Sequence, residues 1–376
     1  MERHLHIISF AIPLPANYGG VIDVYNKVRS LSEQGVKVHL HCFQYDRKPA
    51  EELKEICERV HYYKRQNQMR FIIHKYPYIV RSRKSEQLLF NLLKDSHPIL
   101  FEGLHCCYYL QNVGLKNRTK VARAQNVEHK YYKELAKVET NAFRKVFFFN
   151  EAMKLNLFEK RLKYADKIIA ISPLEYEYYK EKFGEKAEYI AGFHANNEIV
   201  SKEGKGEYAL YHANLSVGEN NKAALFLVNE VFNDLDIPLR IAGMKPSNEL
   251  ENAVFKKENI ELIKNPEKEK MKELIEKAQV LTLPTFQNTG IKLKLLNSLH
   301  TGRHCLVNSP MVLHTGLEEL CIIADSVSEF KEQVKNLMGK PFDVSETERR
   351  KRILAENYSN EENAKKLIRL LFDRDN

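Results

Sequence analysis

The chain has 376 residues, which is more than one hydrophobic core usually organises, so two domains are expected. Its 59 Lys and Arg residues exceed its 50 Asp and Glu residues and give a net charge of +9, which is compatible with anionic ligands, acidic membrane surfaces or nucleic acid. A hydrophobic fraction of 43% suffices for two cores, and no stretch approaches the roughly 20 apolar residues of a membrane-spanning helix, which excludes that class.

The six cysteines indicate a reducing compartment. None forms a CxxC pair or another metal-binding spacing, and several lie in apolar runs where cysteine behaves as a small hydrophobic residue. The apolar run Ile7–Ile12 is too short for a signal peptide and ends at Pro13. We therefore expect a cytoplasmic protein, in peripheral contact at most with the inner face of the membrane.

The beginning of the chain predicts the start of a parallel sheet. Residues 4–12 form an apolar strand, and the loop that follows ends on Gly19-Gly20. Apolar residues at helical spacing predict a helix over 21–31, and residues 36–43 alternate as a second strand. A strand, a glycine-containing loop, a helix and a second strand make the repeating unit of a parallel α/β sheet.

Strands and helices continue to alternate to the end of the chain. In the N-terminal half, further strands are expected at 98–104, 120–125 and 167–172. In the C-terminal half, strands are expected at 208–215, 238–244, 260–265, 280–284 and 304–308, and helices at 223–232, 268–278 and 360–372. Each half therefore predicts a doubly wound α/β sheet.

The stretch 191–207, rich in Gly, Asn and charged residues, is the expected hinge. We expect an N-terminal Rossmann-like domain over 1–195, a C-terminal Rossmann-like domain over 196–357, and a helix over 358–376 that can pack back on the N-terminal domain. Two such sheets place the carboxyl ends of their strands, where α/β proteins bind ligands, on either side of one cleft.

The segment TGIKLKLLNSLHTGRHCLVN, residues 289–308, predicts an amphipathic helix followed by a buried strand. Its apolar residues recur every four positions from Ile291, so they share one face. Gly290 leaves the backbone N–H groups of the first turn approachable, the helix dipole makes that end positive, and Lys292 and Lys294 add to the charge. The segment therefore predicts a phosphate-binding helix; the alternative is an ordinary surface helix that begins on glycine.

Seven stretches of the chain resemble the GT-B glycosyltransferases of family 4, in a form common among bacterial polysaccharide enzymes. They are the Gly19-Gly20 loop, FEGLHCCYYL, RAQNVEHKYY, ADKIIAISPLE, YHANLSVGENNKA, RIAGM and the 289–308 segment, and together they span nearly the whole chain. The resemblance implies an α/β GT-B fold of two doubly wound Rossmann-like domains facing across a cleft. It also implies sugar transfer from a nucleotide diphosphate donor with retention of anomeric configuration. No metal or other cofactor is implied, because positive helix ends and basic side chains stabilise the diphosphate leaving group.

Two glutamates of the family's donor-binding helix are absent from this chain. In register they fall at Thr289 and Asn297, where the family's first glutamate contacts the sugar and its second contacts the ribose hydroxyls. Threonine and asparagine still form hydrogen bonds to hydroxyl groups, without the strengthening that an ionised partner provides.

The family's cationic residues in the loop after the first strand of the second domain are also absent, since Asn214 and Asn220 stand near those positions. The resemblance then assigns Gly290, Lys292 and Lys294 to the donor diphosphate, so that the helix supplies the positive charge that the loop has lost.

Two positions in the N-terminal half are assigned to the same site. Gly19 and Gly20, between the first strand and the first helix, are expected to approach the donor phosphates; a turn with positive φ is their alternative role. Glu102 and His105 lie at the end of the strand at 98–104, where the family often places a histidine that contacts donor sugar or acceptor. We assign these two residues to the catalytic site, with a plain core followed by a turn as the alternative.

Arg123, Asn126 and Glu128 form a polar cluster at the end of the next predicted strand. A polar cluster at the carboxyl end of a strand is typical of a ligand site, so the three residues are assigned to the acceptor side. The alternative role of Asn126 is to cap the helix predicted over 127–135.

Basic and aromatic residues interleave over 61–84 and 141–163. For the second segment, a core helix whose lysines extend to solvent is the favoured interpretation. The alternative is a surface that meets anionic lipid, since transferases of this kind often use lipid-linked acceptors. No RNP, KH or helix-turn-helix signature accompanies these segments, so a nucleic-acid partner is not expected.

The sequence therefore predicts a metal-independent, hexosyltransferase-type glycosyltransferase. It would move a sugar from a UDP- or GDP-sugar to a glycan or lipid-linked saccharide, and domain closure about the hinge would expel water before transfer. The alternatives are a nucleotide-sugar 2-epimerase, which needs no acceptor, and a non-catalytic protein that binds nucleotide sugars with the same fold.

Overall fold

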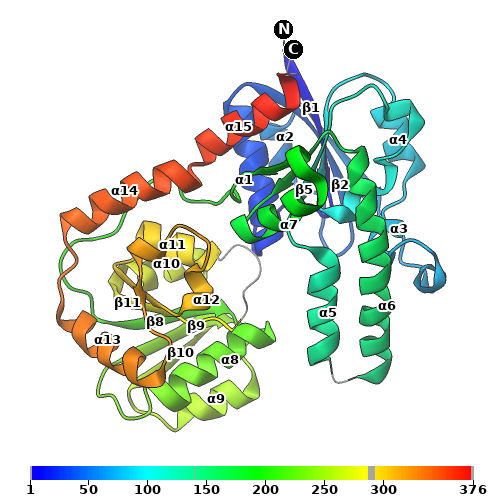
Figure 1. Ribbon diagram of the computed structural model, residues 1–376. Helices are drawn as coiled ribbons and strands as arrows, with labels where there is room; N and C mark the ends of the chain where they lie inside the picture. Colours follow the sequence, from blue (N-terminus) through cyan, green and yellow to red (C-terminus); the bar gives the residue numbers. More distant parts are fainter. Residues whose placement is uncertain (1, 140, 287–292, 374–376) are drawn as a thin grey trace. The chain divides into compact units, whose positions relative to one another are not determined.

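The computed structural model describes residues 2–139, 141–286 and 293–373 (Figure 1). The chain divides into two compact units. The first contains residues 1–194 together with 359–376, and the second contains residues 195–358. The unit boundaries lie one residue from the domain boundaries that the sequence suggested, and the last helix belongs to the first unit.

The first unit is built on a seven-stranded parallel sheet with the strand order β3-β2-β1-β4-β5-β6-β7. Its strands are β1 Arg3–Ser9, β2 Val36–Gln44, β3 Arg59–Lys64, β4 Ile99–Glu102, β5 Lys120–Ala124, β6 Lys167–Ala170 and β7 Ala187–Tyr189. Its α-helices are α1 Gly19–Glu33, α2 Leu53–Ile56, α3 Tyr78–Arg81, α4 Glu86–Leu92, α5 Glu128–Val138, α6 Ala142–Glu159, α7 Pro173–Phe183 and α15 Asn360–Phe372. The chain order reverses between β1 and β4, which is the switch point of a doubly wound sheet.

The second unit repeats this plan with six parallel strands in the order β10-β9-β8-β11-β12-β13. Its strands are β8 Tyr208–Asn214, β9 Leu239–Met244, β10 Ile260–Lys264, β11 Ala278–Leu283, β12 His304–Val307 and β13 Ile322–Ile323. Its α-helices are α8 Gly218–Phe226, α9 Asn248–Phe255, α10 Lys268–Lys277, α11 Leu293–Thr301, α12 Ser309–Val312, α13 Val327–Gly339 and α14 Val344–Tyr358. The switch point lies between β8 and β11.

The core of the first unit combines residues from both ends of the chain. The strands β1 and β2 are buried on both faces, which is why they read as nearly continuous apolar runs. Ala364, Leu367, Ile368 and Leu371 of α15 are buried in the same hydrophobic cluster as these strands. In Figure 1 the red α15 lies beside the blue α1. The C-terminal helix therefore completes the first unit.

The start of α1 corrects one detail of the sequence analysis. Gly19 and Gly20 are the first residues of the helix rather than the end of the preceding loop. Tyr18 holds the N-cap position with no side-chain hydrogen bond to the helix, and the first turn carries no acidic residue. The backbone N–H groups of this turn are therefore not used by a capping side chain.

The helices α5 and α6 run side by side and extend away from the sheet (Figure 1). A core helix was favoured for 141–163, and this is only half right. α6 buries Ala152, Leu155 and Phe158, but a second apolar stripe is exposed along it. That stripe consists of Phe143, Val146, Phe149, Met153 and Leu157. Among the described residues, no helix has both the length and the apolar character needed to cross a membrane.

Candidate functional site

In a doubly wound sheet, ligands bind outside the carboxyl ends of the strands at the switch point. In the first unit this position is bordered by the segments that follow β1, β4 and β5. The glycines at the start of α1, His105, Asn126 and Glu128 all come from these three segments. The structure therefore gathers most of the candidate residues from the N-terminal half at one edge of one sheet.

Gly20 is held against the end of β5 with no room for a side chain. A Cβ atom there would lie 2.7 Å from Gln125 Oε1 and 2.8 Å from Phe10 Cζ. Both distances are shorter than contacts that real Cβ atoms make, so a larger residue at position 20 would require the side chains of Gln125 and Phe10 to shift.

His105 and Glu128 meet at this edge, with His105 Nδ1 3.8 Å from Glu128 Oε1. Burial, with smaller contributions from Arg83 and Arg65, holds the pKa of His105 well below its ordinary value. Burial also raises the pKa of Glu128 to about 8, and Arg83 opposes this shift only in part. At neutral pH the two groups are therefore a neutral imidazole and a protonated carboxyl rather than an ion pair.

This arrangement gives the pair a defined chemical capacity. His105 Nδ1 has no hydrogen-bond partner among the described residues, and the His105 side chain is 23% exposed to solvent. A neutral imidazole can accept a proton or a hydroxyl hydrogen bond, and a protonated carboxyl can donate one. The sequence assigned His105 and Glu128 to different roles, and the structure brings them together.

Arg83 is the basic residue at this edge that sequence reasoning missed. It is buried, and it donates hydrogen bonds from Nε to Phe10 O (3.0 Å) and from Nη1 to Ile79 O (2.6 Å). The guanidinium therefore ties the segment after β1 to α3. Its sequence signal was present in the basic and aromatic stretch 61–84, but nothing in that stretch distinguishes Arg83 from its neighbours.

Glu102 and Arg123 lie beneath this edge, within a buried ion-pair network. Asp23 and Lys27 of α1 lie 2.8 Å apart at Oδ2 and Nζ, Lys27 Nζ lies 2.8 Å from Glu102 Oε1, and Arg123 Nη2 lies 2.9 Å from Asp23 Oδ1. Arg123 also donates to the backbone oxygens of Ile190 and Ala191. The network joins α1, β4 and β5 to the residues that follow β7.

The burial of this network corrects two of the predicted roles. Glu102 and Arg123 each have 0% exposure, so neither presents an atom to a ligand on the surface of the unit. Burial raises the pKa of Glu102, with Lys27 opposing it, whereas Arg123 and Lys27 outweigh burial and lower the pKa of Asp23. These residues position α1 and the strand ends, and they do not themselves line the candidate site.

Asn126 follows β5 and is half-buried. Its backbone oxygen accepts a hydrogen bond from Tyr179 Oη at 3.2 Å. The alternative role of Asn126 as a helix cap is wrong, because Val127 holds the N-cap position of α5 and no side-chain capping bond is formed there.

In the second unit, Asn214, Asn220 and Lys294 form a connected set at the carboxyl end of β8. Lys294 Nζ donates to Asn220 Oδ1 (3.2 Å), and Asn220 Nδ2 donates to Asn214 O (2.9 Å). The ammonium group of Lys294 also lies over the ring of Tyr211, 5.2 Å from its centroid. A lysine from α11 thus brings positive charge to the carboxyl end of β8 and the first turn of α8.

His212 is a second residue here that sequence reasoning missed. Its Nε2 lies 2.8 Å from Ser298 Oγ, and Ser298 Oγ donates to Lys294 O at 2.9 Å. Burial, together with the charge of Lys294, lowers the pKa of His212 to about 4. A neutral imidazole is therefore part of the hydrogen bonding that fixes the first described turn of α11 against β8.

The segment after β11 is anchored on both sides. The side chain of Asn308 binds the backbone of Thr285. Its Oδ1 accepts a hydrogen bond from Thr285 N (2.9 Å), and its Nδ2 donates one to Thr285 O (2.7 Å). Glu219 of α8 accepts hydrogen bonds from Thr285 Oγ1 and from Phe286 N (3.2 Å). These bonds fix the exit of β11 close to the start of α8.

Three of the predicted donor-binding residues, Thr289, Gly290 and Lys292, lie outside the described residues. Asn297 is described and is half-buried on α11, one turn beyond Lys294. Of the predicted donor-binding residues in the second unit, Asn214 and Lys294 are thus brought together through Asn220.

Comparison with known proteins gives one relative in sequence and many in fold. No family model matches the sequence. The chain is 27% identical over 362 residues to a protein of Klebsiella pneumoniae described as an uncharacterized 44.6 kDa protein in the cps region, covering 89% of this chain and 91% of that protein.

Two solved structures illustrate the likeness in fold. TarM matches with a TM-score of 0.68 at 10% identity, covering 99% of both chains. An α,α-trehalose-phosphate synthase (UDP-forming) from Burkholderia xenovorans matches with a TM-score of 0.64 at 11% identity, covering 98% of this chain and 99% of the other. The chain therefore has the α/β fold of these structures, the GT-B fold predicted from its sequence.

Proposed function

We propose that this protein is a glycosyltransferase that moves a sugar from a UDP- or GDP-sugar to a glycan or lipid-linked saccharide. We further propose that it belongs to family 4 of these enzymes, retains the anomeric configuration, and resides in the cytoplasm. The similarity to GT-B structures supports the fold on which this proposal rests. The relative from a cps region supports a role in polysaccharide biosynthesis.

The observation that carries the proposal is the contact of Lys294 with the first turn of α8, which follows β8. Asn214 and Asn220 stand here near the positions where family 4 enzymes commonly carry cationic residues, and Lys294 donates a hydrogen bond to Asn220. In a transfer from a nucleotide diphosphate sugar, negative charge develops on the leaving diphosphate, and a preorganised cation there lowers the barrier. We assign this role to Lys294, Gly290 and Lys292, and assign the sugar and ribose hydroxyls to Thr289 and Asn297.

In the first unit, we assign Gly19 and Gly20 to the approach of the donor phosphates. The uncapped first turn of α1 supports this assignment, because its N–H groups and the helix dipole favour an anion. We assign His105 to a hydrogen bond with a reacting hydroxyl, and Asn126 and Glu128 to the acceptor side. Glu102 and Arg123 are positioning residues in this proposal. We propose that no metal ion takes part in the transfer step.

The exposed apolar stripe of α6 supports a membrane-bound acceptor. Its five apolar residues fall within one face of the helix, and Arg144 and Lys145 lie near its N-terminal end. An exposed apolar face with basic neighbours is typical of a helix that lies in the interface of an anionic membrane. We therefore propose peripheral contact with the inner membrane surface through α6.

The test is the release of nucleoside diphosphate and product from a panel of UDP- and GDP-sugars, with saccharide and lipid-linked acceptors. Lys294→Ala is expected to reduce kcat by about 100-fold or more, as the loss of one preorganised charge-stabilising group does in other enzymes. Lys351→Ala is the control, because Lys351 is 55% exposed and pairs with Glu348 of its own helix. Equal turnover by the two variants would contradict the assignment of Lys294.

Product analysis with the donor alone separates this proposal from its alternatives. A transferase leaves the donor sugar unchanged in configuration until an acceptor is added. Conversion of the donor to its epimer without acceptor would show an epimerase. Tight donor binding without any turnover, over the whole panel of acceptors, would show a binding protein.

A further inference from the structure

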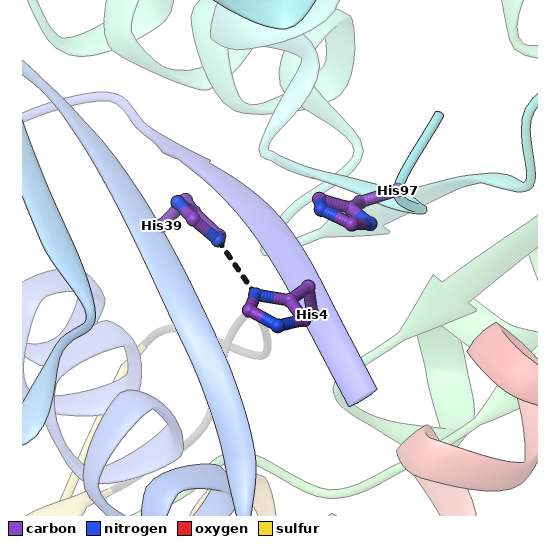
Figure 2. Close-up of side chains that lie close together, drawn as sticks. All are labelled: His4, His39 and His97. Carbon is purple, nitrogen blue, oxygen red and sulfur yellow. Dashed lines mark hydrogen bonds between the residues drawn. The ribbon is translucent and has the colours of Figure 1, made fainter. Parts of the chain in front are cut away.

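Three histidines converge at the amino-terminal end of the sheet in the first unit. His4 lies at the start of β1, His39 lies in β2, and His97 lies in the segment that leads into β4 (Figure 2). One potential ligand nitrogen from each lies within 4.8 Å of the other two. This end of β1 is opposite to the end where the candidate site lies, and no role in that site uses these residues.

The spacing of the three rings suits a metal ion. His4 Nδ1 and His39 Nε2 are 3.0 Å apart, as the dashed line in Figure 2 shows. Two nitrogens bound tetrahedrally to Zn²⁺ at about 2.0–2.1 Å would be ~3.3 Å apart. The ion would therefore replace the shared hydrogen between His4 and His39. The His97 ring is stacked on His4, with ring centroids 4.8 Å apart and planes 16° apart, so it would turn out of this stack to direct a nitrogen at the ion.

The backbone that carries His97 is held firmly. His97 N donates to Asp95 Oδ1 at 3.0 Å, and Arg118 donates through Nε to His97 O at 2.7 Å. Asp95 in turn pairs with Arg118 at 3.1 Å and with His6 at 2.9 Å. The positive charge of Arg118 is therefore balanced by the carboxylate of Asp95, and the groups next to the three histidines are paired with one another.

The outer side of His4 carries the kind of partner that metal-binding histidines use. His4 Nε2 lies 3.4 Å from the carboxylate of Glu2, which is 75% exposed. A histidine that binds a metal through one nitrogen usually donates its other N–H to a carboxylate, which fixes the tautomer and the ring orientation. Glu2 is placed to do this when His4 binds through Nδ1.

We propose that His4, His39 and His97 form a binding site for a divalent zinc-like metal ion, with water or another group in the fourth position. Imidazole ligands suit Zn²⁺, Ni²⁺ and Cu²⁺ and do not select Mg²⁺ or Ca²⁺, which prefer oxygen ligands. The ion would tie β1 and β2 to the segment before β4. The site acts on the stability of the first unit and takes no part in sugar transfer.

The sequence analysis did not find this site because it lacks the short ligand spacing of a zinc motif. His4 and His39 are 35 positions apart, and His97 is 58 positions further. Pairing of β1 with β2 in parallel register sets His4 beside Lys37 and His6 beside His39, so the cluster depends on the register of the sheet.

The test uses the full chain without a histidine tag, freed of metal with a chelator and titrated with ZnSO₄. Calorimetry is expected to give one Zn²⁺ per chain and a rise in Tm, and Co²⁺ is expected to give the visible absorption of a tetrahedral site. His97→Asn and His4→Gln are expected to weaken binding by at least the roughly 10- to 100-fold that loss of an outer partner costs a metal site. Glu2→Gln is expected to have the smaller effect of an outer partner.

His61→Gln is the matched control, because His61 lies on the same sheet in β3, stacked on His41, and is not one of the three ligands. It is expected to bind Zn²⁺ as the unchanged protein does. Circular dichroism verifies that each variant is folded, and His97→Asn, in a loop, is the variant least able to disturb the sheet. Absence of a Zn²⁺-dependent Tm shift, or equal affinity in His97→Asn and His61→Gln, would overturn the proposal. Sugar transfer by both His97→Asn and His61→Gln would show that the proposed function does not depend on the metal site.

Discussion

At the scale of single residues, burial decides the charge of the groups at the candidate site. His105 and Glu128 lie close together, and each is driven toward its neutral form because the charged form has lost its hydration. Glu128 keeps its proton although it begins α5, where the helix dipole favours a carboxylate. The desolvation effect is therefore the larger of the two.

Glu128→Gln tests this directly through the pH dependence of stability. The pKa of Glu128 is raised from 4.5 to about 8 in the folded protein. Between these values the unfolded chain has lost a proton that the folded chain retains, so this residue makes stability fall as pH rises. Below pH 4.5 it contributes no pH dependence. The free energy of unfolding of Glu128→Gln should gain on the unchanged protein by up to about 1.4 kcal/mol per pH unit between pH 5 and 8.

The measurement is urea denaturation at several pH values, followed by fluorescence of the tyrosines and by circular dichroism. Glu134→Gln is the control, because it removes a carboxylate from an exposed position of the same helix. Parallel pH profiles for Glu128→Gln and the unchanged protein would show that Glu128 is ionised in the folded state.

Sequence patterns placed His105, Asn126 and Glu128 shortly after predicted strands, which puts them at the carboxyl edge of the sheet, and their roles there stay predictions. Glu102 and Arg123 lie near the ends of the same strands, and the structure buries both of them in the interior. A buried ion pair and a ligand-binding pair look the same in sequence, because only the three-dimensional packing determines which side chain finds a partner.

At the scale of elements, the buried network around Asp23 holds α1 on the sheet. Asp23 accepts hydrogen bonds from Arg123, Lys27 and Phe193 N. Removal of one partner from a buried network leaves the other charges without a counter-charge. The resulting loss of folding free energy is larger than the net stabilisation that the complete pair provided.

Asp23→Asn is therefore expected to destabilise the first unit by about 3–5 kcal/mol. Because the two units need not unfold together, the measurement is hydrogen exchange of the α1 and β5 amides, read by mass spectrometry. Asp234→Asn is the control, since Asp234 is an exposed residue of the second unit paired with Lys331. A cost for Asp23→Asn no greater than that of the control would show that the network does not hold α1 in place.

The elements that sequence patterns predicted best are those with continuous burial or clear amphipathic spacing. The helix predicted over 268–278 is α10, and the strand predicted over 36–43 is β2. The strand β3 was missed because five of its six residues keep some exposure, so neither alternation nor an apolar run marks it. For α6 the core helix was favoured over an exposed lipid-binding surface, because α6 has apolar residues on more than one side and such a pattern is typical of a core helix.

The α6 stripe makes a prediction about membranes. Phe143→Ser combined with Phe149→Ser is expected to abolish sedimentation with vesicles of anionic phosphatidylglycerol, because it removes two exposed aromatic anchors. The control is Phe255→Ser, which removes an exposed phenylalanine from α9 of the second unit. Unchanged vesicle binding by the double variant would assign the stripe to another partner.

At the scale of the whole molecule, the chain contains two sheets of the same design, each with its own candidate residues at a switch point. The first unit supplies the glycines of α1, His105 and Glu128, and the second supplies Asn214, Asn220 and Lys294. The first unit is also discontinuous, since α15 returns to its core.

The alternation of strands and helices made this architecture predictable, because each half of the sequence repeats the same parallel unit. The return of the last helix was only one option at that stage. Its apolar face had to cover some surface, and the sequence contains no signal that selects one sheet over the other. The histidine cluster was beyond prediction for a similar reason, since it depends on the register of three neighbouring segments.

In the proposed function, this fold binds a nucleotide diphosphate sugar through Lys294 of α11 and the segment that joins β8 to the first turn of α8. The most direct measurement is the Tm of the full chain with UDP-, GDP- and CMP-sugars, because a ligand that binds only the folded state raises Tm. We predict a rise with UDP- or GDP-sugars, no rise with CMP-sugars, and loss of the rise in Lys294→Ala but not in Lys351→Ala. No shift with any nucleotide sugar, at concentrations above the ~1 mM upper end of typical KM values, would contradict the account.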